Sequence, residues 1–181
     1  MPLKNTQNAY GWLAITLHWV SALCIFGLFG LGLWMSDLDY YHAWYTKAPD
    51  LHRSVGFLLV MLTAFRLVWR SLNPAPNPAP APVWQLKAAV AVHYLFYGLL
   101  FLMLVSGYFI TTAEGKPLEV FNWFSIPSLI TEEHMEDVAG EIHEFLAFTL
   151  IGLSALHAAA ALKHHFIDKD STLKKMLGIA R

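Results

Sequence analysis

A chain of 181 residues that is 56% hydrophobic and only 14% charged is too apolar for an ordinary soluble domain. Its formal net charge of −1 becomes informative only when the charges are assigned to the individual loops. We expect no nucleic-acid partner. The single cysteine, Cys24, excludes an internal disulfide and lies in an apolar run, where a membrane-buried thiol is the simplest interpretation.

Residues 12–34 form the first apolar run, which as an α-helix would rise about 34 Å, enough to cross a bilayer with some tilt. The run is too long for the core of a signal peptide, and no small-x-small cleavage site follows it, so we interpret it as a membrane helix. Gly27, Gly30 and Gly32 allow close approach by a neighbouring helix or by a ligand, and both alternatives stay open.

The second span, residues 51–69, follows an aromatic loop and carries His52 and Arg53 at its start. Proline then occupies alternate positions of residues 73–82. Repeated proline cannot continue a helix and favours an extended polyproline II path. We expect a semi-rigid linker between the second and third spans, in preference to a proline-rich ligand for another protein.

The third span, residues 86–112, is followed by an acidic loop over residues 113–136, where a short interfacial helix is one possibility. The fourth span, residues 138–162, leads into a short charged tail. Because no internal repeat or second domain is visible, we expect residues 1–181 to form a single domain. The predicted fold is an all-α membrane protein, a four-helix transmembrane bundle.

The basic residues predict the orientation of this bundle. Lys47, Arg53 and Lys116 fall on one side of a four-span arrangement, and the other nine of the twelve Lys and Arg residues fall on the opposite side. The positive-inside rule therefore places both termini and the proline-rich linker in the cytoplasm. Most of the acidic residues then gather in the outer loops.

Four histidines pair by depth in these spans. His143 and His157 are fourteen residues apart, about 21 Å and just under four helical turns, so both rings leave the same face of the fourth span. His18 and His157 both lie about 9 Å from the cytoplasmic side, and His52 shares the outer layer with His143. One such histidine is usually a hydrogen-bonded core residue. Four that pair across three helices favour a functional role, because ionisable groups in membranes are costly.

Two opposed imidazoles at one depth are suited to hold a six-coordinate haem iron, and the absence of a Cys-x-x-Cys-His motif excludes covalent haem attachment. Arg53 on the outer side, and Arg66 or Arg70 on the inner side, are candidates to bind the haem propionates, with lipid phosphate as the equal alternative. His93 lies in the cytoplasmic layer and receives no ligand role. It could support the inner haem, bind a propionate or serve a substrate site.

These residues resemble the bacterial cytochrome b561 family, and the resemblance covers nearly the whole chain. It is carried by Leu17-His18-Trp19, Leu51-His52-Arg53-Ser54-Val55-Gly56, Glu141-Ile142-His143-Glu144, and the stretch from Leu156-His157 to His164-His165. The resemblance implies two b-type haems in the bacterial cytoplasmic (inner) membrane, one ligated by His18 and His157 and the other by His52 and His143.

The resemblance also implies electron transfer between the membrane quinone pool and a periplasmic donor or acceptor. A quinone such as ubiquinone would sit near the inner haem, where His164 and Trp19 are the candidate contacts, and a histidine could supply the proton that quinone reduction needs. Iron coordinated on both faces has no open site, which favours electron relay over bond-making at the metal. Whether the chain forms a homodimer is left open.

Three alternatives to this relay remain. Some family members resemble superoxide oxidases that reduce ubiquinone, but the acidic outer loops do not suit an anionic substrate and favour a basic or neutral partner. A second alternative is a haem-bearing subunit that anchors a soluble redox enzyme in the membrane. The third is an ion transporter, for which intramembrane carboxylates or inverted repeats would be expected.

Overall fold

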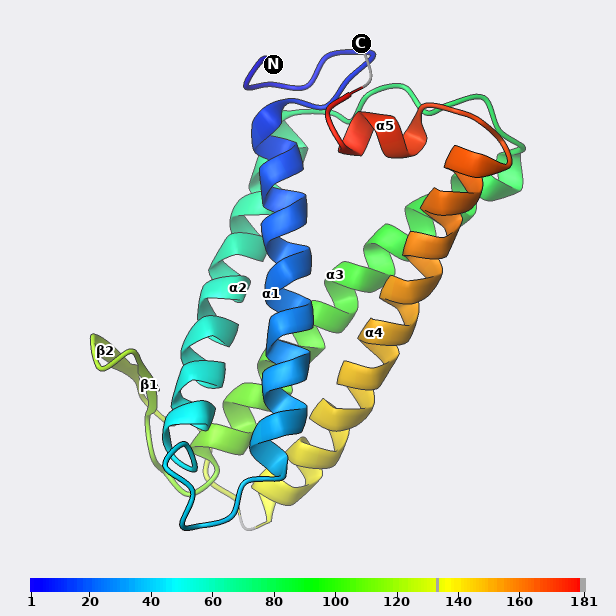
Figure 1. Ribbon diagram of the computed structural model, residues 1–181. Helices are drawn as coiled ribbons and strands as arrows, with labels where there is room; N and C mark the ends of the chain where they lie inside the picture. The colour runs from blue at the N-terminus through cyan, green and yellow to red at the C-terminus, as the bar shows by residue number, and fades with distance from the viewer. Residues whose placement is uncertain (133, 180–181) are drawn as a thin grey trace. The chain divides into compact units, whose positions relative to one another are not determined.

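The computed structural model describes residues 1–132 and 134–179. Four long helices make up most of this described part of the chain (Figure 1): α1 (Trp12–Ser36), α2 (Lys47–Leu72), α3 (Val83–Thr112) and α4 (Met135–Phe166). Each is long and apolar enough to cross a membrane, and each contains one of the four spans predicted from the sequence. The prediction of a mainly α-helical protein with four candidate membrane helices is confirmed.

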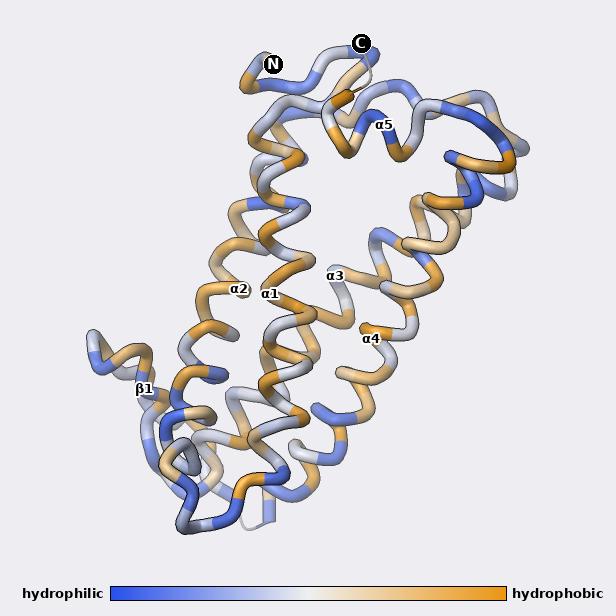
Figure 2. Tube along the Cα trace, in the orientation of Figure 1, coloured by the Kyte–Doolittle hydropathy of each residue, from blue (hydrophilic) through white to orange (hydrophobic). Residues whose placement is uncertain are grey.

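The surface of these helices is apolar around most of their circumference. Large side chains such as Leu23, Phe101 and Phe145 are more than three-fifths exposed. Figure 2 shows hydrophobic and neutral residues along the helices and hydrophilic residues gathered in the connecting loops and the tail. A helix that is hydrophobic all round must be covered by other protein or by lipid, and here lipid hydrocarbon is the environment that fits.

Three helices, α2, α3 and α4, begin earlier than predicted, and proline explains the starts of α2 and α3. Pro49 lies in the first turn of α2, where its missing N–H would be unpaired in any case. Pro82 comes directly before α3, and its carbonyl accepts the N–H groups of Gln85 and Leu86. Proline therefore initiates these helices, whereas the sequence interpretation had started the spans after it.

The described chain forms two compact units, and each unit contains a segment of all four long helices. The first comprises Met1–Ala22, Leu62–Tyr97 and Gly152–Arg181, and the second comprises Leu23–Met61 and Gly98–Ile151. The first unit therefore contains both ends of the chain and the proline-rich linker. The second contains the loops that the sequence predicts on the outer side.

A short helix that was not predicted, α5 (Thr172–Met176), lies beside the N-terminal segment in the first unit (Figure 1). The Lys175 Nζ donates to the Asn77 carbonyl of the proline-rich linker over 2.8 Å. The Asn77 N–H in turn donates to the Gln7 carbonyl over 2.9 Å. The linker is therefore held between the two ends of the chain by backbone groups.

The second unit contains a β-hairpin where the sequence had suggested a short interfacial helix. Strands β1 (Leu118–Val120) and β2 (Phe124–Ile126) pair antiparallel. Residues 121–123 form the three-residue tip, in which Phe121 and Asn122 have φ of 50° and 57° and the Trp123 N–H donates to the Val120 carbonyl. This conformation is strained for a bulky side chain. The Phe121 N–H donates to the buried Ser54 hydroxyl of α2 over 2.9 Å, which fixes the tip in place.

Candidate functional site

His52 of α2 and His143 of α4 face each other in the second unit, with ring centres 6.2 Å apart and ring planes inclined by 65°. Both rings pack edge-on against a glycine. A Cβ added to Gly32 of α1 would lie 3.4 Å from Cε1 of His52, and one added to Gly107 of α3 would lie 3.3 Å from Cε1 of His143. All four long helices thus contribute to this site, which we call the outer cluster after its predicted layer.

The other predicted pair meets in the first unit, where His18 of α1 and His157 of α4 have ring centres 6.3 Å apart and planes inclined by 60°. His93 of α3 joins them, with its ring centre 5.7 Å from that of His157. The Phe96 ring also packs against His157, edge-on at 5.6 Å. We call His18, His93 and His157 the inner cluster.

Arg66 of α2 also contacts the inner cluster, with its Nη2 3.1 Å from Nδ1 of His18. A guanidinium can only donate, so Nδ1 accepts and the ring proton resides on Nε2 in this arrangement. Binding of a metal through Nε2 therefore requires either that Arg66 moves away from Nδ1 or that the ring loses this proton.

Comparison with known families identifies the family of this chain. A family model described as prokaryotic cytochrome b561 matches residues 9–178, which is nearly the whole chain. The chain belongs to the prokaryotic cytochrome b561 family. Membership implies a b-type haem protein that transfers electrons across a membrane, and the resemblance stated from the sequence is confirmed.

Relatives of this cytochrome b561 cover almost its full length. It is 48% identical to cytochrome b561 homolog 2 of Escherichia coli, over 98% of this chain and 96% of the relative. It is 27% identical to cytochrome b561 homolog 1 of the same organism, over 94% of this chain and 98% of the relative. A probable superoxide oxidase of Yersinia pestis is also 27% identical, over 94% of this chain and 97% of the relative.

The geometry of both clusters fits a haem iron. An imidazole nitrogen binds a transition metal at about 2 Å, and the ring centre lies roughly another ångström behind it, so opposed imidazoles on one iron have centres about 6 Å apart. The separations of 6.2 and 6.3 Å match this requirement.

Arg53, predicted to bind a propionate, lies beside the outer cluster of the cytochrome. Its Nη2 forms an ion pair with Asp50 one turn earlier in α2. Its Nε is buried and has no acceptor among the described residues. An unpaired buried donor is costly, so this atom offers a position for an anionic group that the protein itself does not supply.

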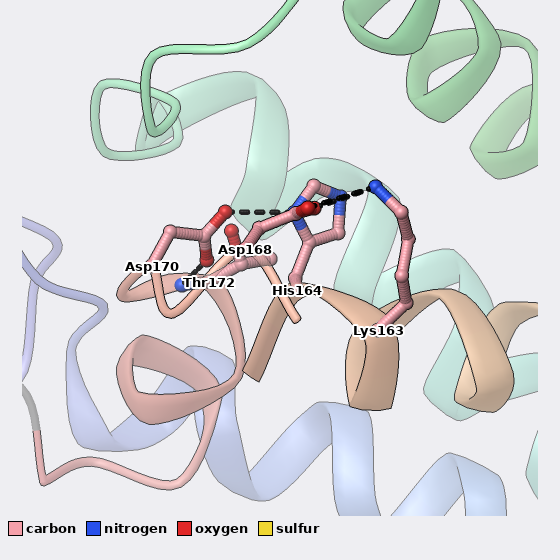
Figure 3. A network of polar contacts seen from close by, with 5 residues as sticks. All are labelled: Lys163, His164, Asp168, Asp170 and Thr172. Atoms are coloured by element: carbon pink, nitrogen blue, oxygen red, sulfur yellow. Dashed lines mark hydrogen bonds and ion pairs between the residues drawn. The ribbon is translucent and has the colours of Figure 1, made fainter. Parts of the chain in front are cut away.

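The two residues predicted to contact quinone have protein partners in the first unit of the cytochrome. The Trp19 ring packs edge-on against His18 at 5.2 Å, and its N–H donates to the Met176 carbonyl of α5 over 3.0 Å. The Nδ1 of His164 lies 2.7 Å from Asp170 Oδ2 and 3.2 Å from Asp168 Oδ2 (Figure 3). Trp19 therefore has only its ring face available, whereas His164 forms an imidazole–carboxylate pair.

The Asp170 carboxylate beside His164 is held ionised. Burial raises the pKa of the Asp170 carboxyl, but hydrogen bonds from Thr172 and His164 outweigh this effect and hold the pKa below its ordinary value. Asp170 therefore stays negatively charged at neutral pH and can accept a hydrogen bond from His164. Lys163 forms an ion pair with the other carboxylate, Asp168 (Figure 3), over 2.7 Å.

Sequence reasoning missed two residues of the outer cluster, Ser106 and Gly107. The Ser106 Oγ lies 3.0 Å from Nδ1 of His143, and Gly107 makes room for the same ring. A signal was present, because Ser106 precedes the end of α3 by six residues, which is about 9 Å of helix and close to the predicted depth of His143. A polar residue at the depth of a histidine on another helix deserved pairing with it.

Proposed function

We propose that this cytochrome b561 holds two b haems and carries electrons one at a time between the quinone pool and a periplasmic donor or acceptor. The observation that supports this most strongly is the equal ring-centre separation in two histidine pairs, 6.3 Å for His18 with His157 and 6.2 Å for His52 with His143. We further propose that residues 1–181 are one domain of the bacterial inner membrane, with both termini in the cytoplasm.

The four histidines have one role in this proposal, which is to hold iron from both sides. A bound haem supplies reversible one-electron transfer at its iron. Because each pair would hold the iron from both sides, substrates would be excluded from the metal and would meet the haem at its edge. α4 contributes one histidine to each cluster, and the partners come from α1 in the inner cluster and α2 in the outer.

Small residues beside the outer histidines leave room for a flat macrocycle. Gly56 lies one turn after His52, and Gly140 lies three residues before His143, so each shares the face of its histidine. A Cβ added to either glycine would meet no described atom within 4 Å. This open space supports a planar, apolar group between the helices.

Arg53 is the residue that would bind a propionate of the outer haem. Its unpaired, buried Nε supports this role, because a carboxylate is the partner that a guanidinium recognises best. The Asp50 ion pair fixes the other side of the same guanidinium. The chain thus presents one pre-oriented donor at the outer cluster.

A quinone site near the inner cluster is supported by His164 and Asp170, which form a proton-carrying pair at the end of α4. Quinone reduction consumes protons, and a histidine paired with a carboxylate can pass one at neutral pH. Trp19 would offer its ring face to the quinone, since its N–H is bonded to Met176.

Superoxide oxidation is the second candidate function, and the name of the Yersinia pestis relative favours it. The charges of this chain oppose it. Arg53 is paired with Asp50 and Lys116 with Glu114, so two of the three predicted outer cations are compensated by carboxylates. An outer surface whose cations are paired with carboxylates does not concentrate an anion. We therefore favour a neutral or cationic periplasmic partner.

The test is the haem content of the purified chain, with spectra of the oxidised and the dithionite-reduced protein. Two haems per chain and a b-type reduced spectrum are expected, whereas a stable haem-free protein would reject the proposal in favour of a transporter. Reduction of the haems by a quinol, without any other subunit, would separate an autonomous relay from a membrane anchor. Rapid reduction by superoxide, at a rate that rises as salt is removed, would reverse our preference for the outer partner.

A further inference from the structure

Ser106 is a buried polar residue of α3, 5% exposed, for which the relay described so far gives no role. Its hydroxyl stands between the outer cluster and the backbone of its own helix. The Oγ lies 3.0 Å from Nδ1 of His143 and 3.1 Å from the Met103 carbonyl oxygen.

These contacts fix the position of the protons. A carbonyl oxygen can only accept, so the single hydroxyl proton of Ser106 is directed to Met103. Towards His143, the Ser106 oxygen then presents a lone pair. Nδ1 of His143 must therefore carry the ring proton, which leaves the lone pair of the ring on Nε2.

We propose that Ser106 is a positioning residue for His143. It holds the imidazole in the tautomer that binds iron through Nε2 and sets the rotation of the ring, while the adjacent Gly107 provides the space that the ring edge needs. The inference rests on the proposed function in one respect, namely that the group bound by Nε2 is a haem iron.

Two other histidines of the pairs, His52 and His18, lack such an anchor. The buried Nδ1 of His52 has no partner among the described residues. The Nδ1 of His18 faces Arg66, which can only donate. An acceptor on the second ring nitrogen makes an imidazole a stronger ligand and favours oxidised iron. Ser106 therefore gives the outer haem a lower reduction potential than it would have without the hydroxyl.

The experiment compares Ser106→Ala with the wild-type protein, both purified with haem bound. The reduction potential of each haem is measured by spectroscopic titration, and the outer component is identified as the one that is missing from His52→Ala. For the outer haem of Ser106→Ala we expect the oxidised-to-reduced ratio at a fixed potential to fall about threefold, a rise of roughly 30 mV. The electron paramagnetic resonance signal of the same ferric haem should broaden, because the ring rotation is no longer fixed.

Two further variants separate positioning from packing. Ser106→Thr keeps a hydroxyl and should restore the potential of the outer haem. Ser21→Ala is the matched control, because Ser21 is also buried in a membrane helix and donates to the carbonyl four residues earlier, over 2.7 Å, within the first unit. Ser21→Ala should leave the outer haem unchanged.

The outcomes distinguish this inference from the proposed function. Two haems with unchanged potentials and an unchanged resonance signal in Ser106→Ala would overturn the positioning role and leave the relay intact. If Ser106→Ala loses only the outer haem while Ser21→Ala retains both haems, that result would support the positioning role of Ser106, as the shift in reduction potential would. A wild-type chain that binds no haem in the outer cluster would reject the proposed function itself.

Discussion

The two histidine clusters share one ring separation but have opposite surroundings. The outer cluster is lined by glycine and by the neutral hydroxyl of Ser106, and the charge of the neighbouring Arg53 is compensated by Asp50. The inner cluster contains the guanidinium of Arg66 and a third imidazole, His93. A nearby cation favours reduced iron, whereas a hydrogen-bond acceptor on the ligand favours oxidised iron. The comparison therefore predicts a higher potential at the inner cluster and electron flow from the outer side inward.

The largest effect is expected from removing one proposed haem ligand. His157→Ala should bind one haem instead of two and should be less stable to heat, because a cofactor that fills space between the helices is lost. Haem per chain and the thermal midpoint are the measurements.

His93→Ala is the matched control for His157→Ala, since both are histidines of the inner cluster. It should keep both haems, because we assign no ligand role to His93. Loss of the inner haem from His93→Ala, with retention in His18→Ala, would instead identify His93 and His157 as the pair.

Arg66→Gln should sharpen the comparison, because it removes the cation but keeps a polar side chain. We expect the oxidised-to-reduced ratio of the inner haem at a fixed potential to rise about tenfold, a fall of roughly 60 mV. Arg70, also in α2 but exposed, provides the control Arg70→Gln, for which a smaller change is expected. Equal shifts in the two variants would show that Arg66 acts only as general positive charge.

Gly107→Ala tests the space around the outer ring. The new Cβ would lie 3.3 Å from Cε1 of His143, so the ring must shift by a few tenths of an ångström, and the content of outer haem should fall severalfold. Gly98→Ala in the same helix meets no described atom within 4 Å and should gain helix stability without loss of haem. The ratio of haem bound to the two variants is the measurement.

The smallest effect is expected in the C-terminal tail after α4, which the contact between His164 and Asp170 helps to hold in place. Because the pKa of Asp170 is lowered in the folded protein, the stabilisation from this contact is fully present above about pH 4 and is lost as the pH falls through the lowered value. Asp170→Asn should expose the tail at neutral pH, with cleavage by trypsin after Lys169 or Lys174 roughly fivefold faster. Asp37→Asn, in the loop after α1, should leave the cleavage rate unchanged.

Much of this arrangement could be predicted because membranes impose simple rules. Hydropathy and length located the four membrane helices, and helix rise alone brought His18 to the depth of His157 and His52 to that of His143. Depth along the helix places Ser106 level with His143, but it does not specify the rotation of α3 about its axis. The contact between the two side chains therefore could not be predicted. The assignment of these four histidines as haem ligands stays a prediction, which the measurements of haem content test.

Backbone groups explain what else was missed. α5 is held by the carbonyl of Met176 and by that of Asn77, and carbonyls leave no signature in a sequence. The hairpin tip places Phe121 at positive φ, against the preference of an aromatic residue, because the hydrogen bond to Ser54 and the strand pairing outweigh the local strain. Both features depend on long-range contacts that local propensity cannot reveal.

The contribution of α4 to both clusters has a consequence for biosynthesis. The ribosome makes α4 after the other three membrane helices, so a nascent chain that ends at the β-hairpin holds no histidine pair in the outer cluster and only His18 and His93 in the inner one. On the proposed ligand assignment, insertion of either haem would follow synthesis of α4, and a cell short of porphyrin would be expected to accumulate full-length apoprotein.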